Sequence, residues 1–249
     1  MADTKGKSEA TSTIWILITN TGNHHYLTEA IRSAKSLFKN EAYKVVVSLD
    51  SSVPGDYSDC IMYKRDAVLS QMDHYELLAK ELPIQDEDRV MLLDGNDMLL
   101  PSALTSINNG SYIGLQIILP DFIIKKVFSE EKNSHETEQT IIRFSPRASM
   151  AEDFSGTTTS GSYFKLYFLD HRPSRSSATR LLEDIHYMDF IEHTTDYSRL
   201  DNPTVIHRIS AEKAPWQGAL LSELEALEAK VIAAWCNKDM TIDSNTIEI

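Results

Sequence analysis

The sequence predicts an α/β fold with a Rossmann-like, mostly parallel central sheet flanked by helices. In the first half of the chain, short apolar segments alternate with segments whose apolar residues recur at helical spacing. Each apolar segment is continuous, as a strand buried on both faces requires. Strands that alternate with helices are joined by right-handed crossovers into a parallel sheet.

Three pairs of strand and helix are predicted along the first half. The apolar stripe of the first helix runs from Leu27 to Phe38, and that of the second runs from Leu69 to Leu82 with a proline just beyond it. Pro101 suits the first turn of the third helix. The strands that precede these helices are expected at residues 14–19, 43–49 and 90–93.

The second half of the chain is less regular. Its polar and small-residue segments are typical of loops, and such loops often carry function. The apolar stripe from Trp216 to Trp235 predicts a C-terminal helix that docks on the domain. Strands are expected at residues 112–119 and 141–144, and loops at 129–140, 156–162 and 171–180.

Composition favours an ordinary soluble protein and argues against two classes of partner. Lys and Arg number 24 against 37 Asp and Glu, a net charge of −13, whereas a general nucleic-acid binder needs a basic face. The first 13 residues contain no secretory signal, and no apolar run reaches the ~18 residues of a membrane span. Because two cysteines are too few for a disulfide framework, we expect a reducing, cytoplasmic location.

The most informative stretch is 92–101, where a predicted strand stops at two carboxylates, Asp94 and Asp97. Acids at the C-terminal tip of a central strand lie where open α/β sheets bind ligands. With Asn96 between them they form a set of hard oxygen donors, suited to Mg²⁺ or Mn²⁺ that carries a phosphate. Asp-Gly and Asn-Asp are also common turn sequences, so a solvated turn is the alternative.

The order of motifs resembles that of the inverting nucleotide-sugar glycosyltransferases of the GT-A fold, the family 2 type. The resemblance covers residues 14–210. It depends on five segments. These are the helix sequence YLTEAIRS at 26–33, the acidic strand end Asp50-Ser51-Ser52, the metal-motif-like Asp94-Gly95-Asn96-Asp97 with Pro101, the Glu-Asp pair in 182–185, and a histidine region at 205–210.

This resemblance implies a domain organisation. A disordered tail (1–13) precedes a single GT-A catalytic domain (14–236), and a frayed tail (237–249) follows it. Within the domain we expect a nucleotide-sugar-binding half (14–110), an acceptor-binding half (111–215) and a C-terminal docking helix (215–236).

The resemblance also implies a reaction used in glycan biosynthesis. A sugar would pass, with inversion, from a UDP-linked nucleotide-sugar donor to a hydroxyl of a glycan or glycoprotein acceptor. Such a transfer needs a base on the acceptor side and a cation, Mn²⁺ or Mg²⁺, at the departing diphosphate. The implied residues are Asp184 with Glu183 beside it for the base; Asp94, Asp97 and His207 for the metal; and Thr19, Asp50, Arg65, Asp94 and Asn96 for the donor.

Two departures from the family pattern leave alternatives open. Asn96 stands where the family usually has Asp, and His207 precedes Arg208 where the family has Arg-x-His. Asp184 is also explained as a helix-capping acid, and Arg65 as part of a solvated charge cluster. A nucleotide-sugar-binding protein without turnover, or another α/β enzyme of nucleotidyl or phosphoryl transfer, are the alternative functions.

Overall fold

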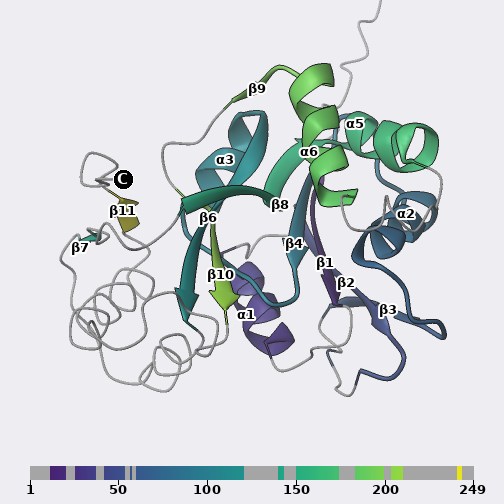
Figure 1. Ribbon diagram of the computed structural model, residues 1–249, viewed down its shortest axis with the longest axis horizontal. Helices are drawn as coiled ribbons and strands as arrows, with labels where there is room; N and C mark the ends of the chain where they lie inside the picture. Colours follow the sequence, from purple (N-terminus) through teal and green to yellow (C-terminus); the bar gives the residue numbers. More distant parts are fainter. Residues whose placement is uncertain are drawn as a thin grey trace, which may run out of the picture.

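A nine-stranded sheet forms the centre of the molecule (Figure 1). The structure, a computed structural model, describes residues 12–20, 26–37, 42–53, 57, 60–120, 140–142, 150–173, 183–198, 203–209 and 240–242.

The first four strands form a parallel unit in the order β3-β2-β1-β4. The chain therefore winds outward from β1 to β3 and then returns to the other side of β1 to form β4. Ligands of open α/β sheets bind at such a switch point, outside the carboxyl ends of the strands. These strands are β1 (Ile14–Asn20), β2 (Tyr43–Asp50), β3 (Ile61–Arg65) and β4 (Arg89–Asp94).

The second half extends the same sheet beyond β4. The strand β8 (Met150–Ser160) runs antiparallel between β4 and β6 (Ser111–Pro120). On β6 lie two parallel partners, β10 (Val205–Ile209) and the short β9 (Tyr197–Ser198). The edge strand β5 (Met98–Leu99) pairs antiparallel with β10. The fold is therefore α/β with a mostly parallel sheet, as predicted.

Helices cover both faces of the sheet. Alternate residues of β1 point to opposite sides, so that Ile16 belongs to one hydrophobic core and Leu17 to the other. The first core packs against α1 (Leu27–Leu37) and α3 (Ala103–Asn109). The second, rich in aromatic rings, packs against α2 (Gln71–Glu81), α5 (Gly161–Lys165), the π-helix η1 (Leu166–His171) and α6 (Glu183–Thr194).

The start of α2 is defined by a capping box. The Ser70 hydroxyl accepts a hydrogen bond from the Asp73 backbone N–H, and the Asp73 carboxylate accepts one from the Ser70 backbone N–H. This reciprocal pair satisfies two backbone donors that a helix N-terminus otherwise leaves open. The helix ends at Glu81, just before Pro83, as the apolar stripe predicts.

The segment 156–162 differs from prediction, because it is not a loop. Its first five residues complete β8, and Gly161 begins α5. Its small residues allow close packing: a Cβ on Gly156 would lie 2.5 Å from the Val205 side chain, and one on Gly161 would lie 2.0 Å from the Gln85 carbonyl oxygen. A cluster of small residues here marks close backbone approach. The strand β3 is a second difference, since its mixed polar sequence does not predict a strand.

Several predicted features lie outside the described residues: the tail at 1–11, the loops at 129–139 and 174–180, and the helix at 215–236. Within the segment expected to be a frayed tail, β11 (Met240–Ile242) pairs with β7 (Thr140–Ile142) in a small separate sheet. In the part of the chain that the structure describes, no helix is long and apolar enough to cross a membrane.

Candidate functional site

The candidate site lies where β1 and β4 end side by side. In the parallel register Thr19 is opposite Asp94, and Asn20 extends one residue further. This is the switch point of the sheet, so the carboxylates that follow β4 lie in the crevice expected for a ligand.

Residues Asp94 to Asp97 form a tight turn that is held against β1. The Asp97 backbone N–H donates to the Asp94 carbonyl oxygen at 3.0 Å, and the Asn96 N–H donates to Asp94 Oδ1 at 2.8 Å. The Gly95 N–H donates to the Thr19 carbonyl oxygen at 2.8 Å. The turn alternative therefore describes the backbone correctly, but the turn is only partly solvated: Asp94 and Asn96 are partly exposed, whereas only 1% of Asp97 is exposed.

Strand pairing brings His207 to this turn. Because Met98 pairs with Ile206 in the antiparallel register of β5 and β10, the next pair outward is Asp97 and His207. His207 Nδ1 lies 2.9 Å from Asp97 Oδ1. An ionised carboxylate can only accept, so the imidazole N–H donates this hydrogen bond. Residues 110 positions apart in the chain thus meet at one edge of the sheet.

Burial and the neighbouring acid disfavour the charge of Asp94. Burial, and after it the negative charge of Asp97, raises the pKa of Asp94 to about 7. Asp97 Oδ2 and Asn96 Oδ1 are buried and, among the described residues, accept no hydrogen bond. Buried acceptors without a donor are unusual, and a bound cation would satisfy both of them.

These observations fit a hard divalent cation. Carboxylate and amide oxygens are the ligands that Mg²⁺ and Mn²⁺ prefer, and Asp94, Asp97 and Asn96 supply them. Among the described residues, however, no group of three or more His, Cys, Asp or Glu has the geometry of a preformed metal site. His207 contacts Asp97, so its role as a metal ligand stays a prediction.

Asp50 lies at the end of the neighbouring strand β2, and its carboxylate contacts Leu69 and His74 in the protein interior. Its Oδ1 accepts the Leu69 backbone N–H at 3.3 Å and lies 3.4 Å from His74 Nε2. The ring of His74 is fully buried, and its Nδ1 lies 2.9 Å from Ser48 Oγ. Burial lowers the pKa of His74 although Asp50 raises it, so the ring is neutral at physiological pH. Binding of uracil by Asp50 stays a prediction.

Arg65 pairs with a partly exposed carboxylate, and Thr19 is buried. The guanidinium of Arg65 makes two hydrogen bonds to the Glu81 carboxylate, at 2.9 and 2.8 Å, and its carbon lies 5.0 Å from the centre of the Tyr63 ring. This arrangement matches the charge-cluster alternative for Arg65. Thr19 is fully buried in the middle of the sheet. Contact of either residue with a donor stays a prediction.

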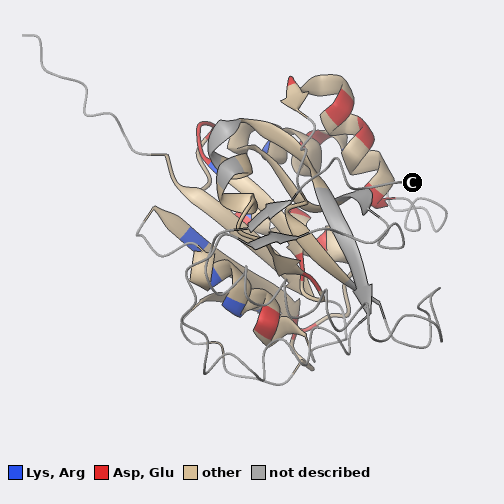
Figure 2. Ribbon diagram, turned by 90° about the vertical axis from the view of Figure 1, so that its left-hand side faces the viewer, with Lys and Arg blue, Asp and Glu red and all other residues tan. Residues whose placement is uncertain are grey.

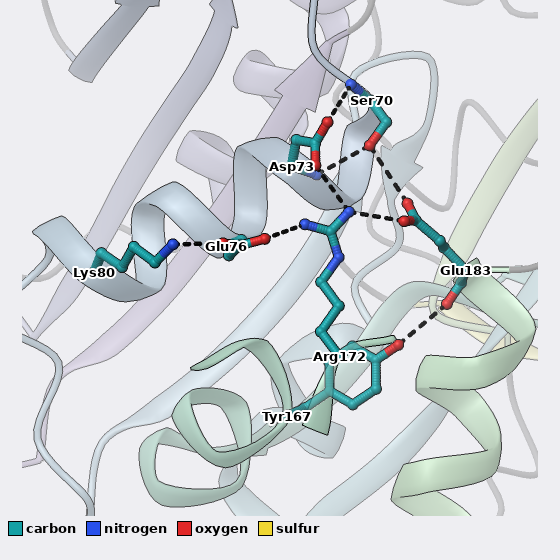
Figure 3. Close-up of polar contacts among 7 residues, drawn as sticks. All are labelled: Ser70, Asp73, Glu76, Lys80, Tyr167, Arg172 and Glu183. Carbon is teal, nitrogen blue, oxygen red and sulfur yellow. Dashed lines mark hydrogen bonds and ion pairs between the residues drawn. The ribbon is translucent and has the colours of Figure 1, made fainter. Parts of the chain in front are cut away.

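The Glu-Asp pair begins α6, and the structure gives its two members different surroundings. Only 4% of Glu183 is exposed, and its carboxylate lies 2.8 Å from the Arg172 guanidinium (Figure 3). Asp184 follows it in the first turn and is partly buried. The helix carries four acidic residues and neither Lys nor Arg (Figure 2). Of the pair, Asp184 is therefore the candidate for proton transfer, while Glu183 is held in an internal ion pair.

Sequence reasoning missed two residues, Gln71 and His74, and it placed a third, Arg172, in a loop at 171–180. A side-chain hydrogen bond from Gln71 lowers the pKa of Asp94, which places the first turn of α2 at the site. His74 anchors Asp50, and Arg172 is buried although the sequence around it predicts a surface loop. The sequence could have indicated Gln71, because this residue directly follows the capping residue Ser70. It could not have indicated the partners of His74 and Arg172, because tertiary contacts set these.

No model of a known protein family matches the sequence, and no curated protein matches it. Among solved structures, TarS of S. aureus is 14% identical to this chain, with a TM-score of 0.46. The match covers 91% of this chain and 71% of the TarS chain. TarS in complex with UDP gives 13% identity over the same shares and a TM-score of 0.47. The bifunctional IspDF of Campylobacter jejuni is 10% identical over 76% of this chain and 49% of its own, with a TM-score of 0.43. Likenesses at this level assign neither a family nor a reaction.

Proposed function

We propose that this chain is a metal-dependent glycosyltransferase of the GT-A type, which moves a sugar from a UDP-linked donor to a hydroxyl acceptor with inversion. The observation that carries the proposal is the meeting of Asp94, Asn96 and Asp97 with His207 at the switch point of the sheet, with two buried acceptor oxygens left unsatisfied there. A diphosphate with its cation suits this edge, since the cation would neutralise both the carboxylates and the phosphates.

On the donor side, Asp94 and Asp97 would hold Mn²⁺ or Mg²⁺, and the Asn96 amide would add a neutral oxygen. The bound cation supplies charge neutralisation for the departing diphosphate. Asp97 is oriented for this role by the hydrogen bond from His207. Asp50, at the end of β2 on the same edge of the sheet, would accept the N3–H of uracil.

On the acceptor side, Asp184 would take the proton from the attacking hydroxyl. It lies in the first turn of α6, directly after the glutamate that Arg172 holds in an ion pair. The acceptor, a glycan or glycoprotein, would bind over the 111–215 half of the chain, in a cytoplasmic setting.

Binding of a nucleotide sugar without turnover is the second candidate. It is favoured by Asn96, which is a weaker metal ligand than Asp, and by the absence, within the described residues, of a preformed group of three ligands. In that case the same edge of the sheet would bind the donor, and Asp184 would be a helix-capping acid.

The test is a screen of UDP-, GDP- and CDP-sugars with and without Mn²⁺, in which released nucleotide is measured alongside the shift in melting temperature on binding. We expect Mn²⁺-dependent release of UDP, and a matched Asp97→Asn protein should release none. Release of a sugar 1-phosphate would indicate transfer of the nucleotidyl group instead. A melting shift without product would establish the binding protein, and neither shift nor product would refute the proposal.

A further inference from the structure

A buried ion cluster connects three elements on one face of the sheet (Figure 3). At its centre is Arg172, the residue that follows η1, whose side chain is 5% exposed. Its guanidinium lies 2.9 Å from Asp73 Oδ1 and 2.8 Å from Glu183 Oε1, and it also contacts the Glu76 carboxylate. Arg172 therefore ties the end of η1 to the first two turns of α2 and to the first residue of α6.

The cluster holds Glu183 at several points. Besides the guanidinium, the Ser70 hydroxyl donates to Glu183 Oε2 at 3.4 Å, and the Tyr167 hydroxyl donates to the Glu183 backbone carbonyl oxygen at 3.4 Å. Contacts to both the side chain and the main chain fix where α6 begins and how its first turn is rotated. Asp184 is the next residue, so its position follows from that of Glu183.

The same turn of α2 reaches the strand-end acids. Ser70 caps α2 and contacts Glu183, while its neighbour Gln71 hydrogen-bonds to Asp94. A short path of direct contacts thus runs from Asp94 through the start of α2 to Glu183 and then along the chain to Asp184. The Ser70–Glu183 contact on this path is partly buried.

Stability alone does not account for such a cluster. Burying one guanidinium among three carboxylates carries a large desolvation penalty, and apolar residues of similar volume often stabilise a protein as well or better. What a forked guanidinium adds is geometry, because it holds two or more carboxylates at set distances and angles.

We propose that Arg172 is a positioning residue, which holds Glu183 against the start of α2 and thereby sets Asp184 relative to Asp94. This inference rests on the proposed transferase function. Arg172 would not contact the reacting atoms, and it would affect turnover only by setting the position of Asp184.

The test is a double-mutant cycle between Arg172→Lys and Asp184→Asn, with turnover and UDP affinity measured for each protein. Lysine keeps the charge and loses the fork, so we expect kcat to fall roughly 10- to 10²-fold, the range that a small misplacement of a catalytic group produces. UDP affinity should stay at the wild-type value. In the Asp184→Asn background, Arg172→Lys should cause no further loss, because residues that act as one unit are not additive.

Two further variants exclude a general effect on folding. Tyr167→Phe removes only the hydroxyl that contacts the Glu183 carbonyl, and it should lower kcat in the same direction, again with no added loss in the Asp184→Asn background. Lys165→Met, on the adjoining helix α5, breaks an exposed ion pair to Asp86 and should leave kcat unchanged. Melting temperature and hydrogen exchange at the first turn of α6 are followed in every variant.

The possible outcomes separate this inference from the proposed function. An active wild type in which Arg172→Lys and Tyr167→Phe both keep their kcat, or in which their losses add fully to that of Asp184→Asn, overturns the positioning role and leaves the function standing. A wild type that transfers no sugar from any donor overturns the function, and the inference fails with it.

Discussion

Gly95 packs closely against the central strand β1, and replacing it with alanine tests the geometry of the candidate site. A Cβ on Gly95 would lie 2.7 Å from Asn20 Nδ2, 2.9 Å from Asn20 Cβ and 2.9 Å from the Thr19 carbonyl oxygen. All three distances are shorter than real Cβ contacts, and one involves the backbone of β1. The variant can therefore fold only if the Asp94–Asp97 turn moves away from β1.

The expected magnitude follows from that displacement. Overpacking by one methyl group costs about 1–3 kcal/mol in the free energy of unfolding. For a chain of this length, each kcal/mol lowers the melting temperature by roughly 2–4 °C. Because Asp94 and Asp97 are the two ends of the displaced turn, we also expect Mn²⁺-dependent turnover to fall by roughly 10²-fold, as for a misplacement of about 1 Å.

Gly161→Ala is the matched control. A Cβ there would lie 2.0 Å from the Gln85 carbonyl oxygen, so this variant should lose at least as much stability. Gly161, however, follows Ser160, which pairs with Arg89 at the opposite end of β4 from Asp94. Melting temperatures and calorimetric UDP affinities, measured where both variants are folded, should show loss of binding in Gly95→Ala alone. A Gly95→Ala protein that is destabilised yet binds UDP with Mn²⁺ as wild type does would refute this account of the site.

Three other predictions concern the carboxylates. Asp97→Asn keeps an oxygen that can accept the hydrogen bond from His207 but removes the negative charge. Mn²⁺-dependent UDP binding, measured by calorimetry, should therefore disappear, and the pKa of Asp94, measured by carboxyl ¹³C NMR, should fall. Metal titrations that do not change would remove Asp97 from the site. Asp184→Asn should lower kcat by ~10² to 10⁴-fold at unchanged UDP affinity, whereas near-normal turnover would leave it a helix cap. Burial raises the pKa of Asp73, but hydrogen bonds from the Ser70 backbone N–H and from Arg172 lower it by more. The pKa of Asp73 is therefore below its ordinary value of 3.8. Its stabilising contribution is therefore present above about pH 4 and is lost as the pH falls further, so the unfolding free energies of the wild type and Asp73→Asn in urea should converge as the pH falls below about 4. Curves that stay parallel over this range would contradict the ion pair.

Much of the first half could be predicted because its signals are local. The continuous apolar runs at β1, β2 and β4 and the apolar stripes of α1 and α2 reflect burial on a parallel sheet, which each segment shows by itself. The location of Asp94 and Asp97 at a strand tip follows from the same pattern. The strand β3 and the end of β8 were missed, since β3 has a mixed polar sequence and the small residues of β8 satisfy a packing constraint set by distant neighbours.

What the sequence determined by itself is therefore the fold class and the strand-end position of the acids. Tertiary structure alone decided how these residues divide their roles. The pairing of β5 with β10 brings His207 to Asp97, and the packing of α6 on α2 commits Glu183 to Arg172 while Asp184 remains outside the ion pair. The physical reason is that register and helix packing join residues far apart in the chain, and the partner of a buried charge depends on which surfaces meet when the apolar faces are buried.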